Sequence, residues 1–332
     1  MVMRFVASLF MFVLLLAPSA HAEGSAVQTI LGEWQDSARN NRIIPYKIYY
    51  APAATGARPV VIFSHGLGGN REGSEFLLSY LAANGYVAVA VQHPGSDTPA
   101  VFGSITPDTP RESIDRSKIQ ADIAKAMSPG VAVDRFRDIP FVLDMLTEMS
   151  TRDQTLRGRL DMEHVGMSGH SYGGVTTQAL AGQRFAMGVS FADPRLKAAI
   201  IYSPSKPRRG DSASAFADVR IPTFHMTGTQ DSSPIAQAQM SPEERLQPYQ
   251  SIHTADKFLL VLAGGDHMVF SGRRFRGDSN PKDERWHEIV QRASLAFWDG
   301  YLLNKPEAKA YLTGGAFERD LGQDGKFEFE LR

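Results

Sequence analysis

Short runs of apolar residues alternate along this chain with longer amphipathic stretches. Apolar runs of about four to eight residues bounded by turn residues are typical of strands buried on both faces. The clearest of them are Val60–Ser64, Tyr86–Val91, His164–Met167, Ala198–Tyr202, Thr223–Gln230 and Phe258–Leu262. Because strands that alternate with helices form βαβ units, the pattern predicts an α/β fold with a mostly parallel sheet.

The stretches between these runs supply the other predicted elements. A lead-in containing Trp34 and a strand near Ile43–Tyr50 come first. Helices are expected at Glu72–Ala83 and Asp134–Met149, and another is expected to begin near Asp283.

Residues 92–133 interrupt this alternation. They hold five prolines around a predicted short helix, Glu112–Met127. Long insertions in compact domains are commonly lids or binding loops, so this one is expected to overhang the catalytic centre as a lid; the alternative is a surface excursion without substrate contact. The apolar residues that could line a pocket are Phe102, Ile105 and Met127, with Met187, Phe191 and Phe270 as further candidates.

The N-terminus has the pattern of an export signal. Arg4 is followed by the apolar segment Phe5–Ala17 and by Pro18–Ala22, which ends in a small-x-small cleavage site. Residues 1–22 are therefore predicted to be a signal peptide and 23–332 a single exported domain, periplasmic or secreted. The apolar segment is shorter than the ~20 residues that span a bilayer, so no stable membrane anchor is expected after cleavage.

Composition agrees with one globular enzyme domain. The 332 residues are 43% hydrophobic, enough for a large core, and a formal net charge of -1 argues against a nucleic-acid partner. The chain has no cysteine, which excludes disulfides and lipid attachment at cysteine. Nothing in the composition indicates an oligomeric state.

Residues 169–173 read Gly-His-Ser-Tyr-Gly between a predicted strand and the helix-compatible stretch Val175–Ala181. A G-x-S-x-G sequence in this setting places the serine on a strained strand-to-helix turn with its hydroxyl exposed. Ser171 is therefore the candidate nucleophile. The alternative is a glycine-rich turn that serves packing alone.

A second glycine-rich loop, His65–Gly69, follows the strand Val60–Ser64. Such a loop exposes backbone N–H groups, which stabilise the oxyanion of an acyl-transfer reaction. We assign the oxyanion hole to the amides of Leu67 and Tyr172. His65 is interpreted as loop support, and the alternative for the loop as a whole is a tight turn without a catalytic role.

A nucleophilic serine needs a general base, and histidine is the side chain whose pKa lies closest to neutrality. His267 follows the strand Phe258–Leu262 on a flexible loop, in the chain order serine, acid, histidine that such hydrolases use. The rivals are His225, a predicted core residue, His287, in a predicted surface helix, His253, and His170, which flanks the serine and suits the role poorly.

The acid must also lie at a strand end on the same edge of the sheet. Asp231 ends the segment Thr223–Gln230 and meets this requirement, whereas Asp193 lies in a predicted turn. Asp231 is favoured and Asp193 remains the alternative. Asp266 adjoins His267 and is interpreted as a loop carboxylate.

These motifs resemble the α/β-hydrolase superfamily and, within it, the dienelactone-hydrolase-like and platelet-activating-factor-acetylhydrolase-like esterases. The resemblance runs from about Arg42 to about Lys305 and is carried by four segments in order, residues 63–69, 169–174, 228–231 and 265–267. It implies a mostly parallel sheet of about eight strands with helices on both faces, and hydrolysis through a serine-bound acyl intermediate.

Two departures from these families matter. Dienelactone hydrolases have a cysteine nucleophile, which this chain lacks. Some acetylhydrolase relatives have the acid after the strand that precedes Thr223–Gln230, but here that strand ends Tyr202-Ser203-Pro204, without a carboxylate. This again favours Asp231.

The sequence therefore predicts a serine hydrolase that cleaves a small-molecule or lipid-like carboxylic ester and needs no cofactor or metal. An amide, peptide or polyester hydrolase with the same machinery and a noncatalytic binding protein remain alternatives. A haloalkane or epoxide hydrolase would need a carboxylate where this chain has Ser171.

Overall fold

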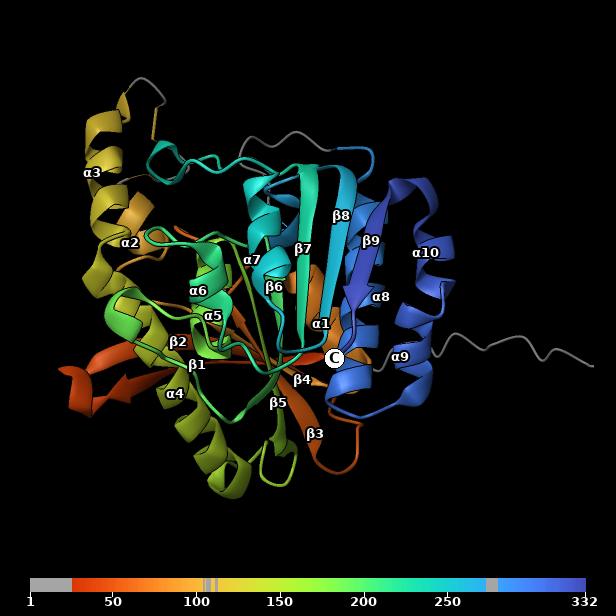
Figure 1. The fold of residues 1–332 in the computed structure, drawn as a ribbon. Helices are drawn as coiled ribbons and strands as arrows, with labels where there is room; N and C mark the ends of the chain where they lie inside the picture. Colours follow the sequence, from red (N-terminus) through yellow and green to blue (C-terminus); the bar gives the residue numbers. More distant parts are fainter. Residues whose placement is uncertain (1–25, 104, 106–108, 111–112, 273–279) are drawn as a thin grey trace, which may run out of the picture.

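A nine-stranded sheet with helices on both faces forms the computed structural model (Figure 1). The structure describes residues 26–103, 105, 109–110, 113–272 and 280–332. The predicted signal peptide, residues 1–22, lies outside the described residues. The predicted α/β class with a mostly parallel sheet is confirmed.

The strands follow one another across the sheet in the order β1-β2-β4-β3-β5-β6-β7-β8-β9. The six central strands from β4 to β8 are parallel, while β1, β2 and β9 are antiparallel to their neighbours. The bounds are β1 Gln28–Asp36, β2 Arg42–Tyr50, β3 Arg58–Ser64, β4 Val87–Val91, β5 Leu160–His170, β6 Leu196–Tyr202, β7 Thr223–Gln230, β8 Lys257–Asp266 and β9 Gly325–Glu330.

Two edge strands, β1 and β9, were not predicted, so the sheet has nine strands where about eight were expected. Antiparallel edge strands expose one face to water and lack the continuous apolar run of a central strand. In β1 only Trp34 and Asp36 are buried, and Trp34 stacks on Tyr46 of β2 with ring centroids 3.8 Å apart. Cross-strand packing of this kind stabilises the edge.

Helices cover both faces of the sheet. Their bounds are α1 Glu75–Ala83, α2 Thr98–Phe102, α3 Arg116–Ala126, α4 Pro129–Arg152, α5 Tyr172–Ala181, α6 Ser212–Phe216, α7 Gln247–Ser251, α8 Asp283–Tyr301, α9 Pro306–Thr313 and α10 Ala316–Leu321. The apolar side chains of α1 and α8 belong to one core cluster and those of α4 and α5 to another, on the opposite face. The sheet is thus buried on both sides, as its apolar strands require.

The segment 92–133 differs in detail from the prediction. It contains α2, which was not predicted, and the long helix α4 begins at Pro129 instead of Asp134. Proline is favoured in the first turn of a helix, where its missing N–H would have no partner anyway. The helix α3 lies at the upper left of Figure 1, away from the sheet.

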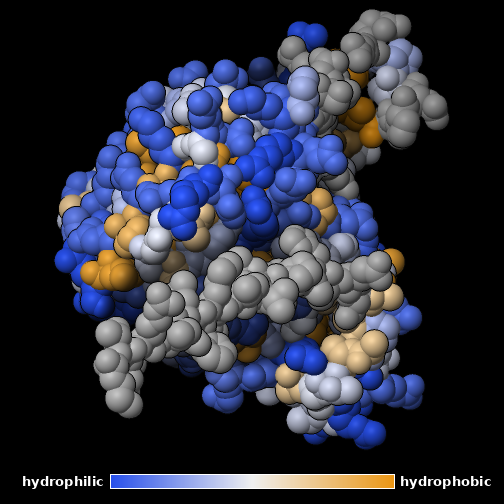
Figure 2. Space-filling model, turned by 90° about the vertical axis from the view of Figure 1, so that its right-hand side faces the viewer, coloured by the Kyte–Doolittle hydropathy of each residue, from blue (hydrophilic) through white to orange (hydrophobic). Residues whose placement is uncertain are grey.

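The face on the side of α9 and α10 is mostly hydrophilic, with hydrophobic residues in small separate groups (Figure 2). Of the helices that the structure describes, none combines the length and the apolar character needed to cross a bilayer.

Candidate active site

Ser171 occupies the sharp turn between β5 and α5. Its backbone has φ 56° and ψ -114°, a conformation that an L-residue adopts only under strain. Glycine is required on both flanks. A Cβ at Gly173 would lie 1.8 Å from the carbonyl oxygen of Ser64, and one at Gly169 would lie 2.2 Å from that of Gly173. The strained turn predicted from the sequence is therefore present.

The structure brings the three predicted side chains together in one hydrogen-bonded chain. The Ser171 hydroxyl lies 2.9 Å from Nε2 of His267, and Nδ1 of His267 lies 2.7 Å from Oδ1 of Asp231. Asp231 is fully buried and follows β7, whereas His267 follows β8. With Nδ1–H donated to the carboxylate, Nε2 is free to accept the serine proton.

Two partners of Asp231 were not anticipated from the sequence. The Thr227 hydroxyl donates to Oδ2 at 2.7 Å, and Nε of Arg245 lies 2.8 Å from Oδ1. Thr227 and Arg245 have no sequence motif, and only the fold brings them to the carboxylate.

The rival acid lies elsewhere. Asp193 precedes β6 and is bound by the Arg195 guanidinium at 2.7 and 2.9 Å. Burial would raise the pKa of Asp193, but the hydrogen bonds from Arg195 outweigh it and lower that pKa. Asp266, the loop carboxylate, is exposed and accepts from the Met268 amide.

The other histidines are also placed away from the base position. His225 is fully buried in β7, as predicted, and burial lowers its pKa to about 3. His287 of α8 stacks on the ring of Phe76, and His253 is exposed. His170 is buried, with Nε2 2.7 Å from the His267 carbonyl oxygen, so it supports the loop that carries the base.

The glycine-rich loop after β3, residues 65–69, lies against the serine and is called the oxyanion loop below. A Cβ at Gly66 would be 3.5 Å from the Cβ of Ser171. Neither the Leu67 amide nor the Tyr172 amide meets an acceptor in the part of the chain that the structure describes. The two predicted donors are therefore available for an oxyanion.

His65 supports this loop, as the sequence indicated. The His93 amide donates to Nε2 of His65 at 3.0 Å, so Nδ1 carries the proton and donates to the Gly66 carbonyl at 2.6 Å. The loop is also fastened to the segment before α2, because the Gly68 amide donates to the Ser96 carbonyl at 2.8 Å.

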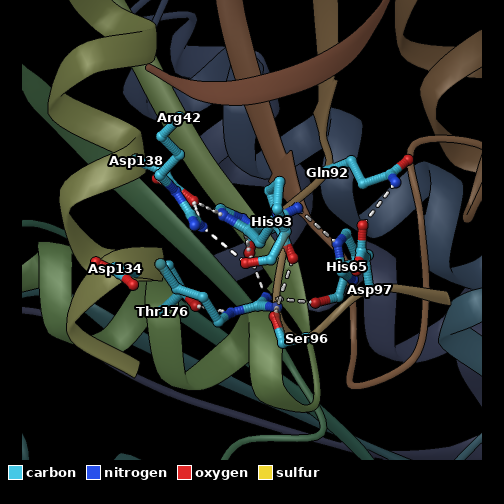
Figure 3. A network of polar contacts seen from close by, with 12 residues as sticks. Arg42, His65, Gln92, His93, Ser96, Asp97, Asp134, Asp138 and Thr176 are labelled. Atoms are coloured by element: carbon cyan, nitrogen blue, oxygen red, sulfur yellow. Dashed lines mark hydrogen bonds and ion pairs between the residues drawn. The ribbon is translucent and has the colours of Figure 1, made fainter. Parts of the chain in front are cut away.

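A second Ser–His–Asp chain lies next to the oxyanion loop, and Figure 3 shows its His93 and Asp138 together with His65 of the loop. The Ser64 hydroxyl is 2.9 Å from Nε2 of His93, whose Nδ1 is 2.9 Å from Oδ2 of Asp138. All three side chains are fully buried, so no substrate can reach Ser64. Burial lowers the pKa of His93 to about 4, and the charge of Arg135 acts in the same direction.

The buried Arg135 of α4 connects this network to the candidate site. Its Nη2 donates to the His65 carbonyl at 2.6 Å and to the Ser64 hydroxyl at 2.9 Å, and its Nε donates to the Thr176 hydroxyl of α5 at 3.0 Å. Its guanidinium also lies 4.6 Å from the centroid of the Tyr172 ring. One cation therefore holds the oxyanion loop and the nucleophile helix together.

The candidate pocket residues fall into different environments. Phe102 of α2 lies against the oxyanion loop, because a Cβ at Gly68 would be 2.4 Å from its ring. Phe270 is buried in the core and Met187 is 99% exposed, so the suggestion that these two line the pocket is wrong, whereas Phe191 is partly buried against the core and its lining role stays a prediction. The lining roles of Ile105 and Met127 stay predictions.

Comparison with known proteins identifies the family. The family model for platelet-activating factor acetylhydrolase, isoform II, matches residues 25–204. The chain belongs to this family. The platelet-activating factor acetylhydrolase of Cavia porcellus is 31% identical over 174 residues, which cover 46% of this chain and 38% of the relative. That of Canis lupus familiaris is 25% identical over 164 residues, covering 42% and 36% respectively.

The residues that match the isoform II family include part of the candidate site. They contain the oxyanion loop and the nucleophile turn but stop at residue 204, before Asp231 and His267. The alignments span less than two fifths of either acetylhydrolase. The acid and the base are therefore assigned from the sequence order and the geometry of this chain.

Proposed function

We propose that the protein is a serine hydrolase that cleaves carboxylic esters through an acyl-enzyme intermediate. The observation that carries this proposal is the hydrogen-bonded chain from Ser171 through His267 to Asp231, with the serine on a strained turn beside two unpaired amides. Membership of a family of acetylhydrolases supports the same reaction class.

In the first half of the reaction, Ser171 Oγ attacks the ester carbonyl carbon while His267 Nε2 takes the hydroxyl proton. The carbonyl oxygen becomes an oxyanion, to which the Leu67 and Tyr172 amides donate. When the tetrahedral intermediate collapses, the carbon–oxygen bond to the alcohol breaks and His267 returns its proton to the departing oxygen. The acyl group is then bound to Ser171.

In the second half, water attacks the acyl carbon and His267 takes a proton from it. Collapse of the second tetrahedral intermediate breaks the bond to Ser171 Oγ, which regains the proton from His267, and the carboxylic acid leaves. Asp231 keeps the imidazole in the tautomer with Nδ1 protonated throughout. The scheme uses no cofactor or metal.

For the substrate we propose a small or lipid-like ester with a short acyl group. The two relatives are named as acetylhydrolases, and this supports an acetyl ester here as well. Purified protein should be assayed with p-nitrophenyl acetate, butyrate and octanoate. We expect kcat/KM to fall as the acyl chain lengthens, and a maximum at octanoate would contradict the acetyl proposal.

The catalytic assignment is tested by covalent labelling, with the second serine chain as control. A fluorophosphonate should label wild-type protein at Ser171, and Ser171→Ala should lose the label and several orders of magnitude in kcat with the fold intact. The matched variant Ser64→Ala, which removes the buried hydroxyl bonded to His93, should keep the label at Ser171. No label in the wild type would favour a noncatalytic binding protein.

We also propose that the protein is exported, periplasmic or secreted, after removal of residues 1–22. The charge, apolar length and small-x-small end of this segment support the proposal. Mass spectrometry of the exported fraction should find a mature protein that begins at Glu23, and an intact N-terminus in that fraction would contradict cleavage.

A further inference from the structure

A buried arginine lies against the candidate triad and has no part in the scheme above. Arg245 belongs to the short 3-10 helix η5, Glu244–Leu246, between β7 and α7. Only 2% of the residue is exposed. A buried guanidinium is retained in a protein only where several acceptors surround it. The acceptors around the Arg245 guanidinium therefore show which parts of the site it fixes.

Arg245 binds the ends of two neighbouring strands. Its Nε lies 2.6 Å from the backbone carbonyl of Asp231 and 2.8 Å from the carboxylate Oδ1 of the same residue. Its Nη1 donates to the carbonyl oxygens of Ser203 and Pro204, at 3.0 and 3.1 Å, just after β6. The guanidinium therefore fixes the acid by its backbone and its side chain together.

The same guanidinium also touches the base. Its Nη2 lies 3.0 Å from Nδ1 of His267. In the tautomer that donates Nδ1–H to Asp231, both nitrogens carry protons, so the guanidinium packs against the edge of the ring without a hydrogen bond.

We propose that Arg245 is a positioning residue: it fixes the Asp231 carboxylate and, through it, the orientation of the His267 imidazole toward Ser171. Among the described residues, Asp231 without Arg245 would keep only the Thr227 hydroxyl and the imidazole as donors to its carboxylate. This inference rests on the proposed hydrolase function and adds a residue on which the geometry of its acid and base depends.

The test compares two substitutions of Arg245. Arg245→Lys keeps a charge but cannot bridge the two strand ends, so we expect kcat to fall by roughly ten- to a hundredfold with KM nearly unchanged. Arg245→Gln also removes the charge, and we expect at least the same loss of kcat, again with KM nearly unchanged.

The matched control is another buried cation at the opposite end of β8 from His267. Lys257 is 3% exposed and binds the Tyr249 carbonyl and the Glu330 carboxylate, with no contact to the triad. Lys257→Gln should lower the melting temperature and leave kcat, measured below that temperature, nearly unchanged. This variant shows what the loss of a buried cation does through stability alone.

The proposal is overturned if Arg245→Lys keeps the wild-type kcat, or if Lys257→Gln, assayed below its melting temperature, loses as much kcat as Arg245→Lys. Should Arg245→Gln not fold, Arg245→Lys decides on its own. Fluorophosphonate labelling of Ser171 in the wild-type protein tests the hydrolase function separately, because labelled wild-type protein together with an unchanged kcat in Arg245→Lys rejects only the role of Arg245.

Discussion

Asp231 is held at both of its carboxylate oxygens. Oδ2 accepts from the Thr227 hydroxyl, and Oδ1 lies within 2.8 Å of both His267 Nδ1 and Arg245 Nε. A carboxylate with this many donors has one orientation, and the imidazole that donates to it is oriented in turn. The acid thus determines which ring nitrogen faces Ser171.

This arrangement predicts the effect of a neutral isostere. Asp231→Asn keeps the shape but presents an amide to His267 and Arg245, which favours the imidazole tautomer that cannot accept the serine proton. We expect kcat to fall by a factor on the order of 10⁴, as it does when the triad aspartate of a serine protease is replaced by asparagine.

Asp193→Asn is the matched control, because among the described residues the Asp193 carboxylate hydrogen-bonds only to Arg195. It should leave kcat nearly unchanged and lower the melting temperature slightly. Steady-state kinetics of both variants with p-nitrophenyl acetate provides the measurement. A larger loss of kcat in Asp193→Asn would show that the acid is misassigned.

At the scale of elements, the candidate site is an arrangement of strand ends. The oxyanion loop follows β3, Ser171 follows β5, Asp231 follows β7 and His267 follows β8, and all four strands are parallel. Their carboxyl ends therefore meet at one edge of the sheet. What keeps the β3 loop aligned with the β5 turn is Arg135 of α4.

Arg135 is therefore expected to affect catalysis from a distance. Arg135→Lys keeps the charge but loses the fork that joins the His65 carbonyl to Thr176. We expect the oxyanion loop to shift and kcat to fall by about tenfold or more, since a displacement of about 1 Å can cost 10²-fold.

Arg42→Lys is the control for Arg135→Lys. Arg42 binds Asp138 and the Pro94 carbonyl in the same network but, among the described residues, forms no hydrogen bond to the oxyanion loop. It should lower the melting temperature with little change in kcat. Equal losses of kcat in both variants, measured below the melting temperature, would contradict a specific role for Arg135.

For the whole molecule, buried neutral histidines link stability to pH. His93, His170 and His225 are at most 4% exposed, and burial lowers the pKa of each, to about 4 for His93 and about 3 for His225. In the unfolded chain a histidine binds a proton below about pH 6.5. Below that pH the unfolded state therefore binds more protons, and stability falls as the pH falls.

The expected slope can be measured. Between pH 6.5 and about 4, each buried histidine should reduce the free energy of unfolding by roughly 1.4 kcal/mol per pH unit. Urea unfolding at pH 7, 6 and 5 measures this loss. His225 is remote from the site, and His225→Leu should reduce the slope by roughly 1.4 kcal/mol per pH unit, the contribution of one proton taken up on unfolding. An unchanged slope would show that His225 is not neutral in the folded protein.

The sequence predicted the parts of the site that depend on local backbone chemistry. Glycines at fixed positions after an apolar run permit only a few turns, so the Ser171 turn and the loop containing Leu67 could be identified without a structure. Strand order along the chain also favoured Asp231 over Asp193. The edge strands β1 and β9 were missed because their half-exposed pattern gives a weak signal.

What the sequence alone determined is thus the set of buried strands, the strained turn and the residue types that follow each strand, since these depend on neighbours along the chain. Only the tertiary structure decided which distant groups meet. Arg135 reaches Ser64 across 71 positions, and Arg245 reaches the acid and the base across 14 and 22. Such contacts leave no local pattern, because a buried charge is located by the acceptors that the fold assembles around it.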